Sequence, residues 1–146
     1  MVTTKTITSA NAVFLLNIPG LYNQAVPIQG FSTDTAFTED SIAPAEAVMG
    51  VDGFLSAGIT LHPTKQKISL AADSDSVTVF DQWYEAQRSV RDIYFANGTI
   101  ELPSLGKTYN LTKGVLTGYK HVPDAKKMLG NQEYEITWET ISAALV

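Results

Sequence analysis

The stretch Lys67–Arg88, KISLAADSDSVTVFDQWYEAQR, contains the change of pattern that decides the fold. Ile68 and Leu70 alternate with polar neighbours, which is the period of a strand with one buried face. From Val77 onward, apolar residues recur at helical spacing in two adjoining stripes: Val79, Trp83, Ala86 and Val90, and Val77, Phe80 and Tyr84. The stretch therefore predicts a strand that leads into one helix, at about residues 75–90.

The four residues Asp73–Ser76 separate this strand from the helix. Their side chains can accept hydrogen bonds from the free amides of a first helical turn, where the helix dipole also favours Asp. We therefore expect them to cap the helix. The apolar arc of the helix is wide, so it packs on the sheet or lies partly against another subunit, since Trp and Tyr are enriched at interfaces.

The rest of the chain has the short strands and turn residues of an antiparallel β-protein. Asp52-Gly53 predicts a tight turn in a hairpin at about residues 46–58, with hydrophobic residues unusually close to the tip. Asn97-Gly98 predicts another turn, between strands at Asp92–Phe95 and Thr99–Leu102.

We predict a mainly β fold: a β-sandwich or barrel of antiparallel strands, with one flanking α-helix and a projecting β-hairpin. Residues 1–146 are expected to form a single domain, in which the Thr-rich residues 1–11 are a flexible N-terminal arm. The final strand, Glu133–Ile141, alternates cleanly. Tyr134, Ile136 and Trp138 lie on one face, and Glu133, Glu135, Thr137 and Glu139 on the other, where the carboxylates repel one another and favour water.

Little in the sequence points to catalysis. The chain has no cysteine, so disulfides, thiol chemistry and Cys-based metal sites are excluded. His62 and His121 are the only histidines, and neither lies in a recognisable nucleophile motif. Asp34, Glu39 and Asp40 do not have the spacing of a calcium loop, and no phosphate-binding glycine motif occurs. We therefore expect no enzyme activity, no cofactor and no metal.

Charge and hydropathy limit the classes of partner that the chain could have. Charged residues make up 17% of the chain, against about a quarter in a typical soluble domain. A partner subunit is one way to cover the remaining surface. The net charge of −5 disfavours nonspecific binding to nucleic acid. The apolar run Ala12–Leu16 is too short for a membrane span or a signal peptide, so we expect a soluble, non-secreted protein.

The order of these elements resembles the tail tube proteins of long-tailed bacteriophages. The resemblance is carried by VMGVDGFLSAG, by ISLAADSDSVTVFDQWYEAQR and most closely by GVLTGYKHVPDAKKMLGNQEYEITWE. It implies a structural virion protein that forms hexameric rings, which stack into a hollow tube for DNA ejection. DNA would pass through without specific binding. Implied partners are other copies of the chain and the tail sheath, baseplate, tail terminator and tape measure proteins, with assembly in the host bacterial cytoplasm.

By this resemblance, the hairpin makes inter-subunit contacts through Val48, Met49, Val51, Asp52 and Phe54. The acidic face of the last strand, with Glu133, Glu135 and Glu139, would line the channel and repel phosphate. Residues 1–11 would also contribute to contacts between rings. One alternative is a needle subunit of a type VI secretion system, which shares the architecture. Another is a monomeric β-sandwich binding module whose ligand would lie near Trp83, Tyr84 and the loops. A third is an enzyme that uses His62 or His121.

Overall fold

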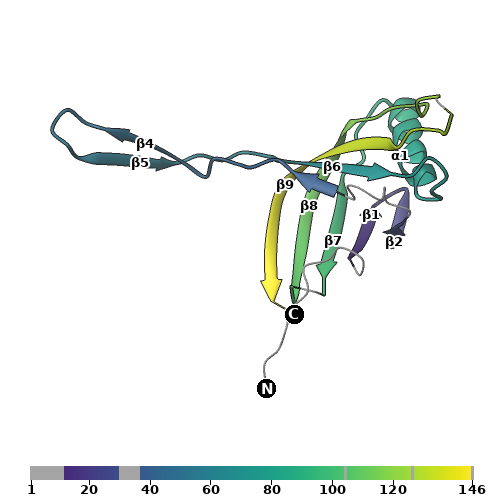
Figure 1. The fold of residues 1–146 in the computed structure, drawn as a ribbon, viewed down its shortest axis with the longest axis horizontal. Coiled ribbons are helices and arrows are strands. Elements are labelled where there is room, and N and C mark those ends of the chain that lie inside the picture. The colour runs from purple at the N-terminus through teal and green to yellow at the C-terminus, as the bar shows by residue number, and fades with distance from the viewer. Residues whose placement is uncertain (1–11, 30–36, 104, 126, 146) are drawn as a thin grey trace, which may run out of the picture.

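The computed structural model describes residues 12–29, 37–103, 105–125 and 127–145. These ranges contain nine strands and one helix (Figure 1). The strands are β1 Val13–Ile18, β2 Tyr22–Ile28, β3 Phe37–Glu39, β4 Ala45–Met49, β5 Leu55–Ile59, β6 Thr64–Leu70, β7 Ala96–Leu102, β8 Lys107–Gly118 and β9 Gln132–Leu145; the helix is α1 Val77–Val90. The mainly β class with one helix is confirmed. The predicted arm at residues 1–11 lies outside the described residues.

Seven strands form one antiparallel sheet in the order β2-β1-β7-β8-β9-β6-β3, and β4 and β5 form a separate pair. The large sheet curls on itself, because the rings of Phe14 in β1 and Phe37 in β3 lie 6.0 Å apart although four strands separate β1 from β3 in the sheet order. The two edge strands do not pair, so the sheet is sandwich-like and not a closed barrel.

The core lies inside this curl and beneath α1. Tyr134, Ile136 and Trp138 are buried, as the alternation in β9 predicts. Phe80 of α1 stacks on Tyr134 with ring centroids 4.3 Å apart, which attaches the helix to the sheet. Trp138 fits because its neighbour on β8 is Gly114: a Cβ at that position would lie 2.5 Å from the indole ring.

The helix agrees with its predicted face but not with its predicted cap. Val79, Phe80 and Trp83 are the buried residues of α1. The prediction that side chains of Asp73–Ser76 cap the first turn is wrong, because Ser76 makes no side-chain capping bond and the amides of Val77–Val79 donate to backbone carbonyls. Ser74 Oγ does accept a hydrogen bond from the amide of Ser76 (3.2 Å), one residue before the helix. Instead, Ser76 Oγ accepts a hydrogen bond from Gln29 N (2.8 Å), and Ser74 Oγ donates one to Gln29 O. The serines attach the helix start to the residue that follows β2.

The predicted turn at Asn97-Gly98 is also wrong, since β7 runs unbroken through both residues. The glycine is needed for packing. A Cβ at Gly98 would lie 3.1 Å from the carbonyl oxygen of Leu15 and 3.2 Å from the side chain of Leu111. Asn97 Oδ1 accepts a hydrogen bond from Lys113 N at a bulge in β8, where Lys113 has a φ of 51°. Close neighbours on both sides thus outweigh the local turn propensity of this pair.

Candidate functional site

The hairpin β4–β5 projects far from the body of the molecule (Figure 1). It is called the arm below, and it is distinct from the predicted N-terminal arm at residues 1–11. Its five paired positions run from Ala45 opposite Ile59 to Met49 opposite Leu55. At the tip, Gly53 N donates to Gly50 O (3.0 Å), and Asp52 Oδ1 accepts from Phe54 N (3.2 Å). The Asp52-Gly53 pair therefore lies in the turn, as predicted, and Gly53 takes the positive φ of 85° that a tight turn favours.

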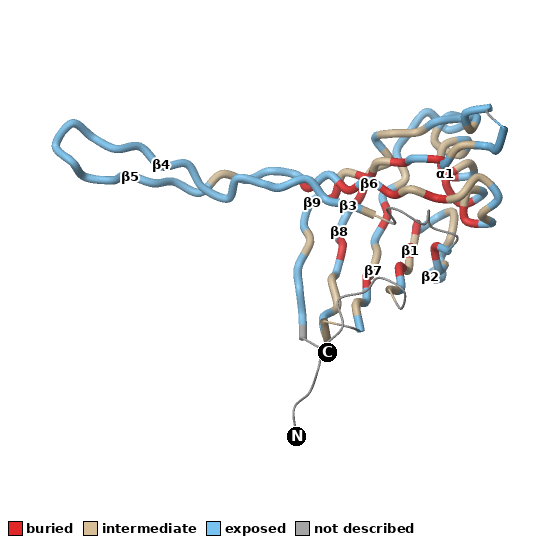
Figure 2. Tube along the Cα trace, viewed as in Figure 1, coloured by how far each residue is buried: buried red, intermediate tan, exposed pale blue. Residues whose placement is uncertain are grey.

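The arm is exposed along its whole length (Figure 2). Large apolar side chains near its tip are mostly in water: Val48 is 68% exposed, Met49 63%, Val51 112%, Phe54 73% and Leu55 64%. An isolated two-stranded hairpin is marginally stable in water, and contiguous exposed apolar surface is a mark of an interaction site. Fully burying one such side chain is worth about 1.5–3 kcal/mol. The arm is therefore a candidate interaction surface.

A second candidate surface is a free strand edge on β9. From Gln132 to Trp138, this strand pairs with β6 on one side, and from Glu135 onward with β8 on the other. Pairing with β6 ends where Thr64 meets Trp138, whereas pairing with β8 continues to Leu145. Within the described chain, the second half of β9 thus has a strand on one side only. Such edges attract other strands unless they are covered.

The face predicted to line a channel carries both signs of charge. Glu133 and Glu135 are on the opposite face of β9 from buried Tyr134 and Ile136, as predicted. However, Lys67 of β6 lies directly opposite Glu135 in the strand register, so the two side chains share a face. Glu135 also accepts a hydrogen bond from Thr117 Oγ1 (3.0 Å). Lys67 offsets part of the acidic charge on this face.

Glu139 lies beyond a change of alternation in β9. Trp138 faces inward, because its indole Nε1 donates to Gln66 Oε1 (2.9 Å) in the core. Ile141, three residues later, also faces inward, where it lines a cavity together with Gln66. The alternation therefore shifts between these two residues, and parity alone does not place Glu139 with the other two carboxylates. Its Oε2 lies 3.7 Å from Lys113 Nζ in an exposed ion pair.

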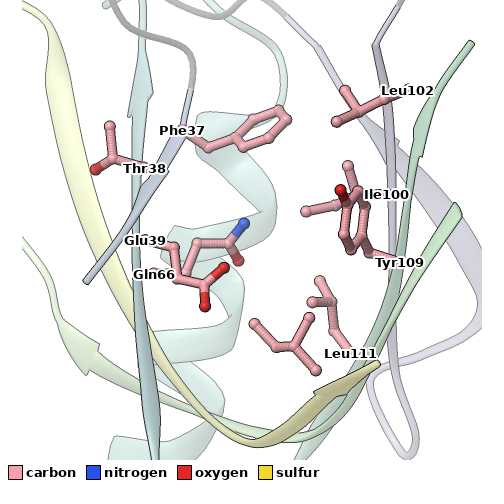
Figure 3. Close-up of a pocket in the computed structure, with 9 residues that line it drawn as sticks. Phe37, Thr38, Glu39, Gln66, Ile100, Leu102, Tyr109 and Leu111 are labelled. Carbon is pink, nitrogen blue, oxygen red and sulfur yellow. The ribbon is translucent and has the colours of Figure 1, made fainter. Parts of the chain in front are cut away.

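The structure also contains a cavity that sequence reasoning missed. About 270 Å³ of space lies inside the curl of the sheet, lined by residues of β3, β6, β7, β8 and β9 (Figure 3). Ile100, Leu102 and Leu111 line one side, whereas Glu39 and Gln66 lie across from them. Because the lining comes from five strands far apart in the sequence, no local motif could have revealed it.

The two histidines lie in different surroundings, neither of which is a catalytic constellation. His121 meets the stacked rings of Tyr84 and Tyr119 edge-on, with ring centroids 4.9 and 4.8 Å away. Tyr119 donates a hydrogen bond to Asp81. The pKa of Tyr119 is raised mainly by burial and, to a smaller extent, by the Asp81 carboxylate. His62 lines a shallow hollow at the base of the arm. No group of three His, Cys, Asp or Glu residues suited to a metal ion occurs within the described part of the chain.

Trp83 and Tyr84, the predicted binding-module residues, do not form a ligand site together. Trp83 is buried, and its Nε1 donates to the carbonyl of Tyr94 (2.9 Å). Tyr84 is half-buried and stacks on Tyr119, with ring centroids 4.4 Å apart. In the described residues, no helix is long and apolar enough to cross a membrane.

Comparisons with known proteins bear on the fold and the family. The fold is similar to that of a chain in the cryo-EM structure of the anti-feeding prophage baseplate, with a TM-score of 0.60, 11% identity and coverage of 99% of both chains. A chain in the anti-feeding prophage cap, the tube-terminating cap, gives 0.58 and 10%, with 100% of this chain and 95% of that chain covered. A chain in the sheath/tube terminator of the PVC extracellular contractile injection system gives 0.57 and 11%, with 98% and 99% covered.

At these identities the similarity establishes a shared fold. A search of curated proteins gave no match. A model of one protein family, described as tail fiber protein gp32, matches residues 5–142, which is nearly the whole chain. Because this model matches more than half of the chain, the chain belongs to the tail fiber protein gp32 family.

Proposed function

We propose that the chain is a structural subunit of a phage tail, or of a related injection machine, and that it assembles with copies of itself into hexameric rings that stack into a hollow tube. The observation that carries the proposal is the arm, whose apolar side chains have little to bury against in their own subunit. The similarity to chains from contractile injection structures supports it, since those assemblies contain tube, cap and baseplate parts.

The free edge of β9 supports ring formation. A strand of a neighbouring subunit that paired along Glu139–Leu145 would extend the sheet from one subunit to the next and cover an aggregation-prone edge. The arm then supplies the second contact, between neighbouring subunits or successive rings, through Val48, Met49, Val51, Asp52 and Phe54. Residues 1–11 are proposed to contribute further contacts between rings. Other tail proteins, such as the sheath, baseplate, terminator and tape measure proteins, are further proposed partners.

The face with Glu133 and Glu135 is the proposed channel lining, and we propose that Glu139, beyond the change of alternation in β9, also faces the channel. Carboxylates there repel DNA phosphates, and Lys67 moderates this repulsion, so DNA would pass without being held. The subunit would reside in the virion after assembly in the host cytoplasm, and it would have no catalytic role.

Negative-stain electron microscopy of the purified protein tests the proposal. Hollow tubes of stacked rings are expected at high concentration. Single rings that never stack would favour a part that ends a tube, in line with the similarity to cap and terminator chains. A monomer at all concentrations would contradict the proposal and favour the binding-module alternative. If tubes form, neighbouring genes for sheath, baseplate and tape measure proteins would favour a phage tail over a type VI needle.

A further inference from the structure

The cavity inside the curled sheet has the size and lining of a receptor for apolar side chains. It holds about 270 Å³ and its apolar wall includes Ile100, Leu102 and Leu111 (Figure 3). An apolar cavity of about 150 Å³ holds one benzene ring, so this one has room for a phenyl ring and a further aliphatic side chain. Space of this kind forfeits contacts unless something fills it.

The arm tip presents a matching pair of side chains. Phe54 supplies a phenyl ring and Val51 a short aliphatic group, both on the same turn and both mostly in water. The arm extends away from the body of its own subunit (Figure 1), so it does not reach its own cavity. An arm tip that fills this cavity must then come from another copy.

From this match we infer that the cavity of each subunit receives the arm tip, Val51 and Phe54, of a second copy. The inference rests on the proposed function and adds the receptor surface that it leaves open. The polar wall fits the tip's backbone. The turn's own hydrogen bonds use the amides of Gly50, Gly53 and Phe54, and the exposed Glu39 carboxylate offers oxygen acceptors for the amides at the apex of the turn. Asp52 carries the same charge as Glu39 and stays at the mouth, in water.

Insertion of this kind is a heterologous contact, because the arm of one subunit meets a different surface of the next. Such contacts close into rings or continue as open helical filaments, unless two copies exchange arms reciprocally about a two-fold axis. Each subunit has one arm and one such cavity, so inside an assembly every arm can be inserted and every cavity occupied. This stoichiometry suits a tube built from one chain.

Cross-linking tests the inference directly, because the chain has no cysteine. Val51→Cys and Leu102→Cys variants are purified separately, mixed, allowed to assemble and treated with a short bis-maleimide. Covalent dimers are expected in the mixture and at most traces in either variant alone. Met128→Cys serves as the matched control, since Met128 is 83% exposed and lies outside the cavity. Val51→Cys should give no dimer with it.

The outcomes separate the inference from the proposed function. If the mixture forms tubes and Val51→Cys cross-links to Met128→Cys instead of Leu102→Cys, the arm has a different receptor and the inference is overturned while the tube survives. If the wild-type chain never assembles, the proposed function fails first. A second variant, Leu102→Trp, fills the cavity. We expect circular dichroism to show a folded protein, and we expect the amount of assembled protein to fall at least tenfold. Undiminished assembly of folded Leu102→Trp would also overturn the inference.

Discussion

Replacing Gly114 with alanine should destabilise the chain by about 2 kcal/mol. The added Cβ would lie 2.5 Å from the Cε3 and Cζ3 atoms of Trp138 and 2.9 Å from Cγ2 of Ile136. The indole has no room to retreat, because it is fully buried and its Nε1 is bonded to Gln66. Overpacking costs about 1–3 kcal/mol, and weakening the Gln66 bond adds about 1 kcal/mol. The lower chain entropy of alanine in the unfolded state returns about 0.4–1 kcal/mol.

The assay is thermal and urea unfolding followed by circular dichroism. A loss of about 2 kcal/mol corresponds to a fall in Tm of roughly 6 °C for a chain of this size and to a midpoint shift of about 1 M urea. Gly58→Ala is the matched control, because Gly58 lies in the arm with nothing within 4 Å of the added Cβ. It should change stability by less than about 0.5 kcal/mol. Equal stability of the two variants would refute the register of β8 against β9, and with it the curl that forms the cavity.

Three further predictions concern assembly, pH and the channel. Phe54→Ala should leave the unfolding midpoint within error and weaken each subunit contact by about 1.5–3 kcal/mol, or roughly 10- to 150-fold, measured by analytical ultracentrifugation; a folded variant that assembles like wild type would show that Phe54 makes no contact. Tyr134 has a pKa raised above 10.0 by burial and then by the Asp81 carboxylate. The folded state therefore keeps a proton that the unfolded state releases, so stability should fall as pH rises above about 10. Tyr134→Phe should make this fall shallower in Tm measured against pH, and an unchanged slope would contradict the assignment. Glu133→Lys combined with Glu135→Lys should still give tubes, but these should retain DNA in a gel-shift assay at low salt and release it at high salt; no difference from wild type would place this face outside the channel.

The class of the fold and its projecting hairpin were predictable because they depend on local patterns. Alternation in β9 predicts that Tyr134 and Trp138 are buried, and helical spacing predicts α1 nearly to the residue. Asp52-Gly53 predicts the turn of the arm correctly, because β4 and β5 pair only with each other among the described strands and the local turn preference is not opposed. In these cases the local preference and the tertiary structure agree.

Tertiary contacts explain the failures. Asn97-Gly98 has the sequence of a tight turn, yet β1 and β8 hold it as a strand, and the glycine makes room for Leu111 and for the backbone of Leu15. Ser76 bonds to Gln29, which is distant in sequence, instead of to its own helix. The cavity, with its lining from five strands, depends on the curl of the sheet, which no single stretch of sequence encodes.

The role of the arm in assembly is tested most directly by negative-stain electron microscopy of two proteins side by side: the wild-type chain and a variant in which residues 48–54 are replaced by a minimal turn. The segment makes no contribution to the core, so the variant should keep the wild-type circular dichroism spectrum and Tm. We expect tubes from the wild-type chain and only monomers or isolated rings from the folded variant. Normal tubes from the variant would contradict an assembly role for the arm, and an unfolded variant would show that the hairpin belongs to the core.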